Sequence, residues 1–257
     1  MLNMRNTEFS GKIIWVVGAT GALGTEISRR LAESGATVVA SSRSRDKLEA
    51  LQSALEPYSK IDIAPLDVTH DKEVKSVASE IISRHTHIDA LINSTSVSLF
   101  ADFLDLDDET WHGVIESKLM AYVRTCRAVI PHMVKRGAGN IINISGRSAR
   151  QPLPTHLPGG CVNAAVNLLT KGLADRYYND NVRVNAVSPG PIESDRFTAM
   201  KSSHDQNKST TDARPILARK IGHPSDIAET VLWLLSERAR HLTGTVIQVD
   251  GGSTACV

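Results

Sequence analysis

A stretch near the start of the chain, Gly18-Ala19-Thr20-Gly21-Ala22-Leu23-Gly24, decides how the whole sequence is interpreted. It follows Ile13–Val17, a β-branched run that predicts a buried strand, and it opens Ala22–Ser34, whose apolar residues fall on one helical face. Glycines at such a strand-to-helix turn let the backbone approach a pyrophosphate, whose charge is met by the helix N-terminus. The stretch therefore predicts a dinucleotide-binding turn; the alternative is a turn that uses glycine for geometry alone.

The alternation of strand and helix patterns continues along the chain. Predicted strands are Thr37–Ala40, Ile61–Pro65, Ile88–Asn93, Asn140–Ser145, Arg183–Val187 and Thr245–Val249. Predicted helices are Arg45–Leu55, Lys72–His85, Glu109–Met133, Cys161–Tyr178 and Ser225–Ser236. Repeated units of this kind predict an α/β Rossmann fold: a doubly wound parallel sheet of about seven strands with helices on both faces.

Composition indicates a single compact domain over residues 1–257, with a variable loop or lid at about 193–214 that is rich in polar residues. The formal charge is +1 and the chain has no basic run, so a partner held mainly by charge, such as nucleic acid or an anionic membrane, is not expected. Aromatic residues make up only 4% of the chain, so a base-stacking or carbohydrate-binding surface is not expected either. No apolar run is long enough to span a membrane, and none near the first residues is typical of a signal peptide. The three cysteines, Cys126, Cys161 and Cys256, are widely spaced and predict neither disulfides nor a metal site, which is consistent with a cytoplasmic location.

The end of the second predicted strand indicates which dinucleotide is bound. In this fold the residue about 20 positions after the glycine turn contacts the adenosine ribose, and an acid there favours NAD. This chain has Ser42 followed by Arg43, with Arg45 close behind. A hydroxyl and a guanidinium suit a 2′-phosphate, so NADP(H) is preferred over NAD(H). The alternative is that Arg43 is a solvated residue before the next helix.

Several further stretches resemble the short-chain dehydrogenase/reductase family, and the resemblance covers nearly the whole chain. The stretches that carry it, besides the glycine turn, are Leu66-Asp67-Val68-Thr69, Leu91-Ile92-Asn93, Gly139-Asn140-Ile141-Ile142-Asn143-Ile144-Ser145, Val182–Ile192 and Val249-Asp250-Gly251-Gly252. The resemblance implies a small-molecule substrate and a homo-oligomer, a dimer or a tetramer, paired through the two long helices and the last strand. It also implies that the cofactor contacts Gly18, Thr20, Gly21, Leu23, Gly24, Ser42, Arg43, Asp67, Val68, Asn93, Ser94, Thr95, Ile144, Pro189, Gly190, Ile192 and Ser194.

The catalytic positions of the family are all replaced. Family members use a Tyr as proton donor or acceptor, a Lys four residues later that lowers its pKa, a Ser that orients the substrate oxygen, and an Asn that holds a relay water. Alignment on the motifs places Gly159 at the Tyr position, Asn163 at the Lys position, Gly146 at the Ser position and Lys118 at the Asn position. Glycine cannot transfer a proton, so carbonyl chemistry by the Tyr–Lys mechanism is not expected.

Three side chains are candidate catalytic residues. Lys118 could contact the nicotinamide ribose or polarise a substrate oxygen, Arg147 could bind a carboxylate or phosphate, and His156 could replace the missing acid. The alternatives are a lysine that reaches solvent, a solvated loop arginine and an incidental histidine.

These observations leave more than one function open. The first hypothesis is an NADP(H)-binding oxidoreductase that reduces a C=N or activated C=C or C=O group, since hydride transfer itself requires only that the nicotinamide be positioned against an electrophilic carbon. The alternatives are a catalytically silent NAD(P)-binding protein that acts as a sensor or regulatory subunit, and a non-redox enzyme on the same fold.

Overall fold

The computed structural model describes residues 7–56, 58, 60–96, 99–194 and 221–255. They form one parallel seven-stranded sheet with the strand order β3-β2-β1-β4-β5-β6-β7. The strands are β1 (Ile13–Val17), β2 (Thr37–Ser41), β3 (Ile61–Ile63), β4 (Ala90–Asn93), β5 (Gly139–Ile144), β6 (Val182–Pro189) and β7 (Val246–Val249). This arrangement confirms the predicted doubly wound α/β fold.

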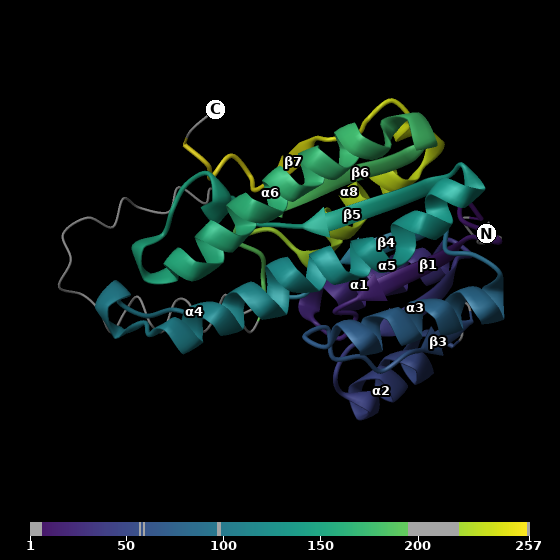
Figure 1. Cartoon of the computed structure of the whole chain (residues 1–257), viewed down its shortest axis with the longest axis horizontal. Coiled ribbons are helices and arrows are strands. Elements are labelled where there is room, and N and C mark those ends of the chain that lie inside the picture. Colours follow the sequence, from purple (N-terminus) through teal and green to yellow (C-terminus); the bar gives the residue numbers. More distant parts are fainter. Residues whose placement is uncertain (1–6, 57, 59, 97–98, 195–220, 256–257) are drawn as a thin grey trace.

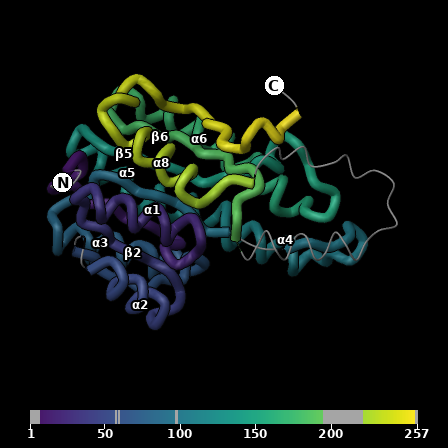
Figure 2. Tube along the Cα trace, turned by 180° about the vertical axis from the view of Figure 1, so that it is seen from behind, coloured from purple at the N-terminus to yellow at the C-terminus, as the bar shows by residue number. Residues whose placement is uncertain are grey.

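Each face of the sheet buries its own apolar cluster because side chains alternate along every strand. On β1, Ile14 and Val16 join one cluster, whereas Ile13, Trp15 and Val17 join the other. The first cluster is completed by α1 (Ala22–Glu33), α2 (Arg45–Leu55) and α8 (Pro224–Leu235). The second is completed by α3 (Asp71–His85), α5 (Ala121–Arg136) and α6 (Leu157–Tyr177). Figure 1 shows the α3, α5 and α6 side, and Figure 2 shows the opposite side, where α1 and α8 pack together.

The helix that the sequence predicts over Glu109–Met133 is interrupted. It consists of α4 (Asp108–Val114), a π-helical segment (Ile115–Met120) and α5, which continues to Arg136. The wider turn of the π segment changes which side chains face the sheet, and such segments occur frequently at functional sites. Figures 1 and 2 show α4 extending beyond the end of the sheet.

Other boundaries differ by a few residues. Helix α6 begins at Leu157, ahead of the predicted Cys161, because Pro158 is tolerated in a first turn and Gly159 and Gly160 are accommodated in the helix. Strand β6 runs to Pro189, two residues beyond the predicted Val187, and β3 ends at Ile63. None of the helices in the described part of the chain is long and apolar enough to cross a membrane. The predicted lid at 193–214 lies outside the described residues from position 195 onward.

Candidate functional site

Two adjoining cavities lie at the carboxyl ends of the strands. One, of about 560 Å³, extends from the glycine turn toward β2, and the other, of about 350 Å³, extends toward β5, β6 and α6. Both are bordered by Thr20, Gly21 and the segment Ser94–Ser96. Together they make one continuous cleft at the edge of the sheet where open α/β folds bind ligands.

The glycine turn lies at the centre of this cleft. Gly18 has φ +84°, and a β-carbon there would lie 2.7 Å from the Ser94 carbonyl group, so the strands can approach this closely only at a glycine. Gly24 lies against the Gly18 backbone and has no room for a side chain. Gly21 precedes the first residue of α1, so the N-terminus of that helix faces the cleft. This geometry supports the sequence-based prediction of an anion site at the turn.

The larger cavity contains the residues predicted to contact adenosine. Ser42, Arg43, Asp67 and Val68 all line it. Burial by itself raises the pKa of Asp67, but hydrogen bonds from the hydroxyl group and backbone N–H of Thr69, at 2.7 and 2.9 Å, outweigh it and hold that pKa below its usual value.

Two further residues of this cavity were missed by the sequence reasoning. Ser44 caps α2 by accepting a hydrogen bond from the backbone of Lys47, and both residues line the cavity near Arg43. The sequence carried a signal for this, since Lys47 falls in the first turn of the predicted helix Arg45–Leu55, directly after the predicted phosphate-binding segment.

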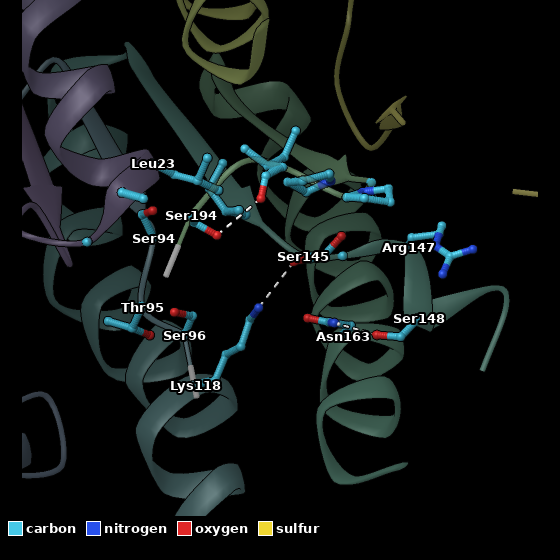
Figure 3. Close-up of a pocket in the computed structure, with 18 of the residues that line it drawn as sticks. Leu23, Ser94, Thr95, Ser96, Lys118, Ser145, Arg147, Ser148, Asn163 and Ser194 are labelled. Atoms are coloured by element: carbon cyan, nitrogen blue, oxygen red, sulfur yellow. Dashed lines mark hydrogen bonds between the residues drawn. The ribbon is translucent and has the colours of Figure 1, made fainter. Parts of the chain in front are cut away.

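Lys118 points inward from the π segment and lines the smaller cavity. Only 5% of the residue is exposed, and Nζ donates a hydrogen bond to the carbonyl oxygen of Ser145 at 3.2 Å (Figure 3). Nζ also lies 6.0 Å from the ring centroid of Tyr122, whose hydroxyl donates to the Ile144 carbonyl oxygen at 3.0 Å. The lysine therefore does not reach solvent, and its Nζ is held at the floor of the cleft.

The glycine at position 146 and the asparagine at position 163 depend on one another. A β-carbon on Gly146 would lie 2.7 Å from Nδ2 of Asn163, so the amide occupies the space beside the glycine. Nδ2 donates to Ser148 Oγ at 3.0 Å, whereas Oδ1 is buried and has no hydrogen-bond partner among the described residues. The amide thus takes the place of a side chain at position 146.

His156 and Gly159 form a second pair of this kind. The imidazole lies where the β-carbon of a residue at 159 would have to be, so only glycine fits beneath it. Nδ1 of His156 donates to the Leu99 carbonyl oxygen at 2.7 Å, and the ring stacks on Phe100 with centroids 4.9 Å apart. His156 is 5% exposed and forms part of the cavity wall, so its side chain is held in a fixed position beside the cavity.

Arg147 occupies a different side of the cavity. Its Nη1 donates to the carbonyl oxygen of Ser253 at 3.3 Å, and Figure 3 shows the guanidinium turned away from Lys118. Burial lowers the pKa of Arg147, and the nearby Asp250 carboxylate offsets part of this effect. The structure therefore does not bring Arg147 and Lys118 together.

Most remaining predicted cofactor residues border the cleft. They are Thr20, Gly21, Leu23, Ser94, Thr95, Ile144, Pro189, Gly190, Ile192 and Ser194. The side chain of Asn93 does not, because it is fully buried in a polar chain inside the core. Its Nδ2 donates to Asn143 Oδ1 at 2.9 Å, and its Oδ1 accepts from Thr125 Oγ1 at 2.8 Å. This side chain joins β4 to β5 and α5 rather than facing a ligand.

Comparison with known proteins decides the family. Residues 18–254 match a family model described as enoyl-(acyl carrier protein) reductase. The chain belongs to the short-chain dehydrogenase/reductase family. This membership places it in the class of NAD(P)-dependent oxidoreductases.

Individual members of this short-chain family agree with that assignment. The chain is 30% identical over 243 residues to the 3-oxoacyl-(acyl-carrier-protein) reductase FabG of Thermotoga maritima, covering 94% of this chain and 97% of that protein. It is also 30% identical over 251 residues to the human dehydrogenase/reductase SDR family member 4, covering 97% and 90% of the two chains. The crystal structure of L-sorbose reductase from Gluconobacter frateurii, complexed with NADPH and L-sorbose, superposes with a TM-score of 0.88 at 26% identity, covering 98% of this chain and 100% of that one.

Proposed function

We propose that this short-chain dehydrogenase/reductase is an NADP(H)-dependent oxidoreductase that works without a Tyr–Lys pair and reduces a C=N or activated C=C or C=O group of a small molecule. The observation that carries the proposal is the way the replaced positions pack. His156 fits over Gly159, and the Asn163 amide fits beside Gly146, while a cavity of about 350 Å³ stays open next to the buried Lys118. Loss of function alone would not require such matched replacements.

The cleft has the features that a nicotinamide dinucleotide needs. The backbone cradle at Gly18 and Gly24 admits no side chain, and the N-terminus of α1 offers backbone N–H groups to a pyrophosphate. The other predicted cofactor residues that line the cleft surround it, although they lie far apart in the sequence, from Ser42 to Ser194. When bound, the reduced cofactor supplies the hydride.

NADP(H) is the proposed form because of the side chains beside β2. Ser42 follows that strand, and Arg43 and Lys47 line the same cavity. Two cations and a hydroxyl match a 2′-phosphate, and the alternative diol of NAD would leave both cations without an anionic partner from the cofactor.

Lys118 and His156 are the proposed catalytic residues. The buried ammonium group of Lys118 can donate a hydrogen bond to a substrate oxygen and stabilise negative charge that develops there. The Leu99 carbonyl group holds the Nδ1 proton of His156, so exchange of a proton with a substrate would involve Nε2. Arg147 remains a candidate for a substrate anion at the other side of the cavity.

The first experiment is to titrate the purified protein with NADPH, NADH and NADP⁺ by calorimetry, and then to follow NADPH oxidation with imines, conjugated enones and simple ketones. We expect NADPH to bind at least tenfold more tightly than NADH, and turnover with an imine or enone. Binding without turnover of any of these classes would favour the silent cofactor-binding alternative. If none of the three dinucleotides binds, both the oxidoreductase proposal and the silent cofactor-binding alternative are excluded.

We also propose that the protein is cytoplasmic and forms a homo-oligomer. The resemblance to the family implies pairing through the surfaces of α5, α6 and β7. Sedimentation velocity measures this directly: a dimer or tetramer is expected, and a monomer over a wide concentration range would contradict it.

A further inference from the structure

The π segment between α4 and α5 separates one backbone carbonyl group from the partner that it has in a regular helix. In an α-helix the N–H of Ala121 would bond to the carbonyl oxygen four residues earlier, which belongs to Ser117. In this chain it bonds to the carbonyl oxygens of Glu116 and Lys118 instead. The wide turn therefore bypasses the carbonyl group of Ser117, and a bypassed carbonyl group calls for another donor.

Thr95 supplies such a donor from the end of a neighbouring strand. Its Oγ1 lies 2.9 Å from the carbonyl oxygen of Ser117, and because a carbonyl oxygen cannot donate, the hydroxyl group is the donor. Thr95 comes shortly after the last residue of β4, so this bond joins the edge of the sheet to the π segment. A hydroxyl proton used in this way is not available to a ligand, which limits the Thr95 hydroxyl group to accepting hydrogen bonds from one.

The backbone of Thr95 contacts the same helical stretch a second time. Its carbonyl oxygen accepts a hydrogen bond from the hydroxyl group of Tyr122 at 3.2 Å, and that hydroxyl group also lies 3.0 Å from the carbonyl oxygen of Ile144. Ser117 directly precedes Lys118, and Tyr122 follows Lys118 by one helical turn. Thr95 therefore fixes the chain on both sides of the residue whose side chain enters the smaller cavity.

The direction of the π segment matters because its adjacent residues face different cavities. Ser117 lines the larger cavity and Lys118 lines the smaller one. A return of this segment to α-helical bonding would change the direction of Lys118 and take Nζ from the Ser145 carbonyl oxygen, which it contacts at 3.2 Å. Figure 3 shows Thr95 and Lys118 on the same side of the cavity, opposite Asn163.

We propose that Thr95 is a positioning residue whose hydroxyl group holds the π segment in the conformation that directs Lys118 into the smaller cavity. In this role Thr95 does not touch the reacting atoms and acts through Lys118. The inference rests on the proposed function in that it takes Lys118 as a catalytic residue. The direction of the lysine side chain, however, can be measured without any substrate.

Acetylation by acetic anhydride measures how accessible the Lys118 amino group is. Its rate is compared with that of the exposed Lys135 on α5, by mass spectrometry of the two peptides, and because Lys118 is 5% exposed, a side chain that leaves its place becomes more reactive. Thr95→Val keeps the branched shape and removes the hydroxyl group, so we expect it to raise the ratio of the two rates at least about threefold, which corresponds to one ordinary hydrogen bond. Thr95→Ser keeps the hydroxyl group and should leave the ratio within about twofold.

Thr230→Val is the matched control. Thr230 Oγ1 also donates to a backbone carbonyl oxygen, that of Asp226 at 3.0 Å, but it lies on α8 and lines neither cavity. This control should leave the ratio within about twofold. Thermal unfolding confirms that each variant is folded. Thr95→Ala, which removes the hydroxyl group and puts nothing in its place, is used instead if the valine variant does not fold.

Steady-state kinetics distinguishes positioning from a general loss of structure. On the substrate class found by screening, Thr95→Val should lower kcat at least about fivefold and leave KM for NADPH within about twofold, and Thr95→Ser should retain the original kcat. In the Lys118→Met background, Thr95→Val should lower kcat by less than about a further twofold, because the residue through which Thr95 acts has been removed.

Several results would overturn the inference. They are an acetylation ratio that Thr95→Val and Thr95→Ala leave unchanged, a ratio that rises equally in Thr95→Ser, and an equal loss of kcat from Thr95→Val with and without Lys118. Weaker NADPH binding with an unchanged ratio would assign Thr95 to the cofactor alone and would overturn it as well.

The acetylation experiment also separates this inference from the proposed function. If the ratio depends on the Thr95 hydroxyl group while no substrate class is turned over, the proposed function fails and the positioning role stands. If Lys118→Met abolishes turnover while Thr95→Val changes neither the ratio nor kcat, the proposed function stands and the positioning role fails.

Discussion

The imidazole of His156 occupies the position that a β-carbon on Gly159 would need. Alignment on the sequence motifs predicts that position 159 corresponds to the family's Tyr, and a side chain there would collide with the histidine ring. The ring is held in place from two directions, by the Leu99 carbonyl oxygen and by Phe100. Restoring the family residue therefore requires two changes in this chain.

We expect Gly159→Tyr alone to destabilise the protein by at least about 1–3 kcal/mol, because it forces His156 out of a packed site. Gly159→Tyr combined with His156→Ala should recover most of that loss. Thermal unfolding of both variants measures the difference. Gly172→Ala is the control: it lies on the same helix with open space around it, and it should raise stability slightly because alanine is the better helix former. Equal stability of the single and double variants would show that the overlap is relieved elsewhere.

Lys118→Met should lower kcat at least tenfold, about 1.4 kcal/mol of barrier, with a smaller change in KM, because the ammonium group is expected to act on charge that develops during the reaction. The matched control, Lys135→Met, removes an exposed lysine of α5 and should leave both constants unchanged. Steady-state kinetics on the substrate class found by screening gives both values. A change in KM alone would assign Lys118 to ground-state binding.

Arg43→Ala and Lys47→Ala should each weaken NADPH binding about tenfold and leave NADH binding within about twofold, since each removes a cation from the cavity that we propose binds the 2′-phosphate. Arg45→Ala is the comparison, because Arg45 is exposed, pairs with Glu49 at 3.7 Å and does not line the cavity. Calorimetric titration of the three variants with both cofactors tests this. Parallel losses for NADPH and NADH would place these side chains away from the phosphate.

Asp89→Asn should lower stability at pH 7 by about 1–3 kcal/mol. Burial by itself raises the pKa of Asp89, but the backbone N–H of Ile13 at 2.8 Å and Arg136 at 2.7 Å outweigh it and hold the pKa below its usual value. Lys12 and His87 also contact this carboxylate, at 3.4 and 3.0 Å. A depressed pKa means that the stabilisation is fully present above the unfolded-state pKa of about 3.9 and is lost as pH falls through the folded-state value.

The difference between the unaltered protein and Asp89→Asn should therefore shrink below about pH 4 and disappear at lower pH. Chemical denaturation from pH 7 down to the acid limit measures it. Asp175→Asn, on an exposed carboxylate that pairs with Lys171, serves as the control and should change stability by less than about 0.5 kcal/mol. A constant difference across the whole range would mean that the charge of Asp89 does not matter.

The fold could be predicted from the sequence because its signals are local. Apolar residues that recur every two residues identify strands, and those that recur every three to four residues identify helices, wherever a run is long. The bounds of β1 and α2 were predicted without error. The π segment could not be predicted, because the apolar spacing of the sequence there is also compatible with one continuous α-helix. Helix α6 starts earlier than expected because Pro154, Pro158 and the two glycines resemble a loop when taken one at a time.

The site was predictable where backbone geometry dictates residue type, as at Gly18 and Gly24. The sequence also singled out Lys118 and His156 as candidate catalytic residues and Asn163 as a replaced family position, but it could not predict where their side chains point. Whether a lysine turns inward depends on the π segment, and the fit of His156 over Gly159 depends on a hydrogen bond to Leu99, far away in sequence. For Asn93 the sequence could not show that its side chain is buried in hydrogen bonds to Asn143 and Thr125, and a contact of this residue with the cofactor stays a prediction.

The π segment between α4 and α5 also fixes the length of the chain at this point. The i→i+5 hydrogen bonds of this segment accommodate more residues per turn than an α-helix does, so deleting one residue from 115–120 would return the segment to α-helical bonding and change which of its side chains face the cavity. Either Lys118 would leave the cavity or Tyr122 would leave its contact with Ile144. This segment can therefore tolerate substitutions, but it cannot tolerate the insertion or deletion of a single residue.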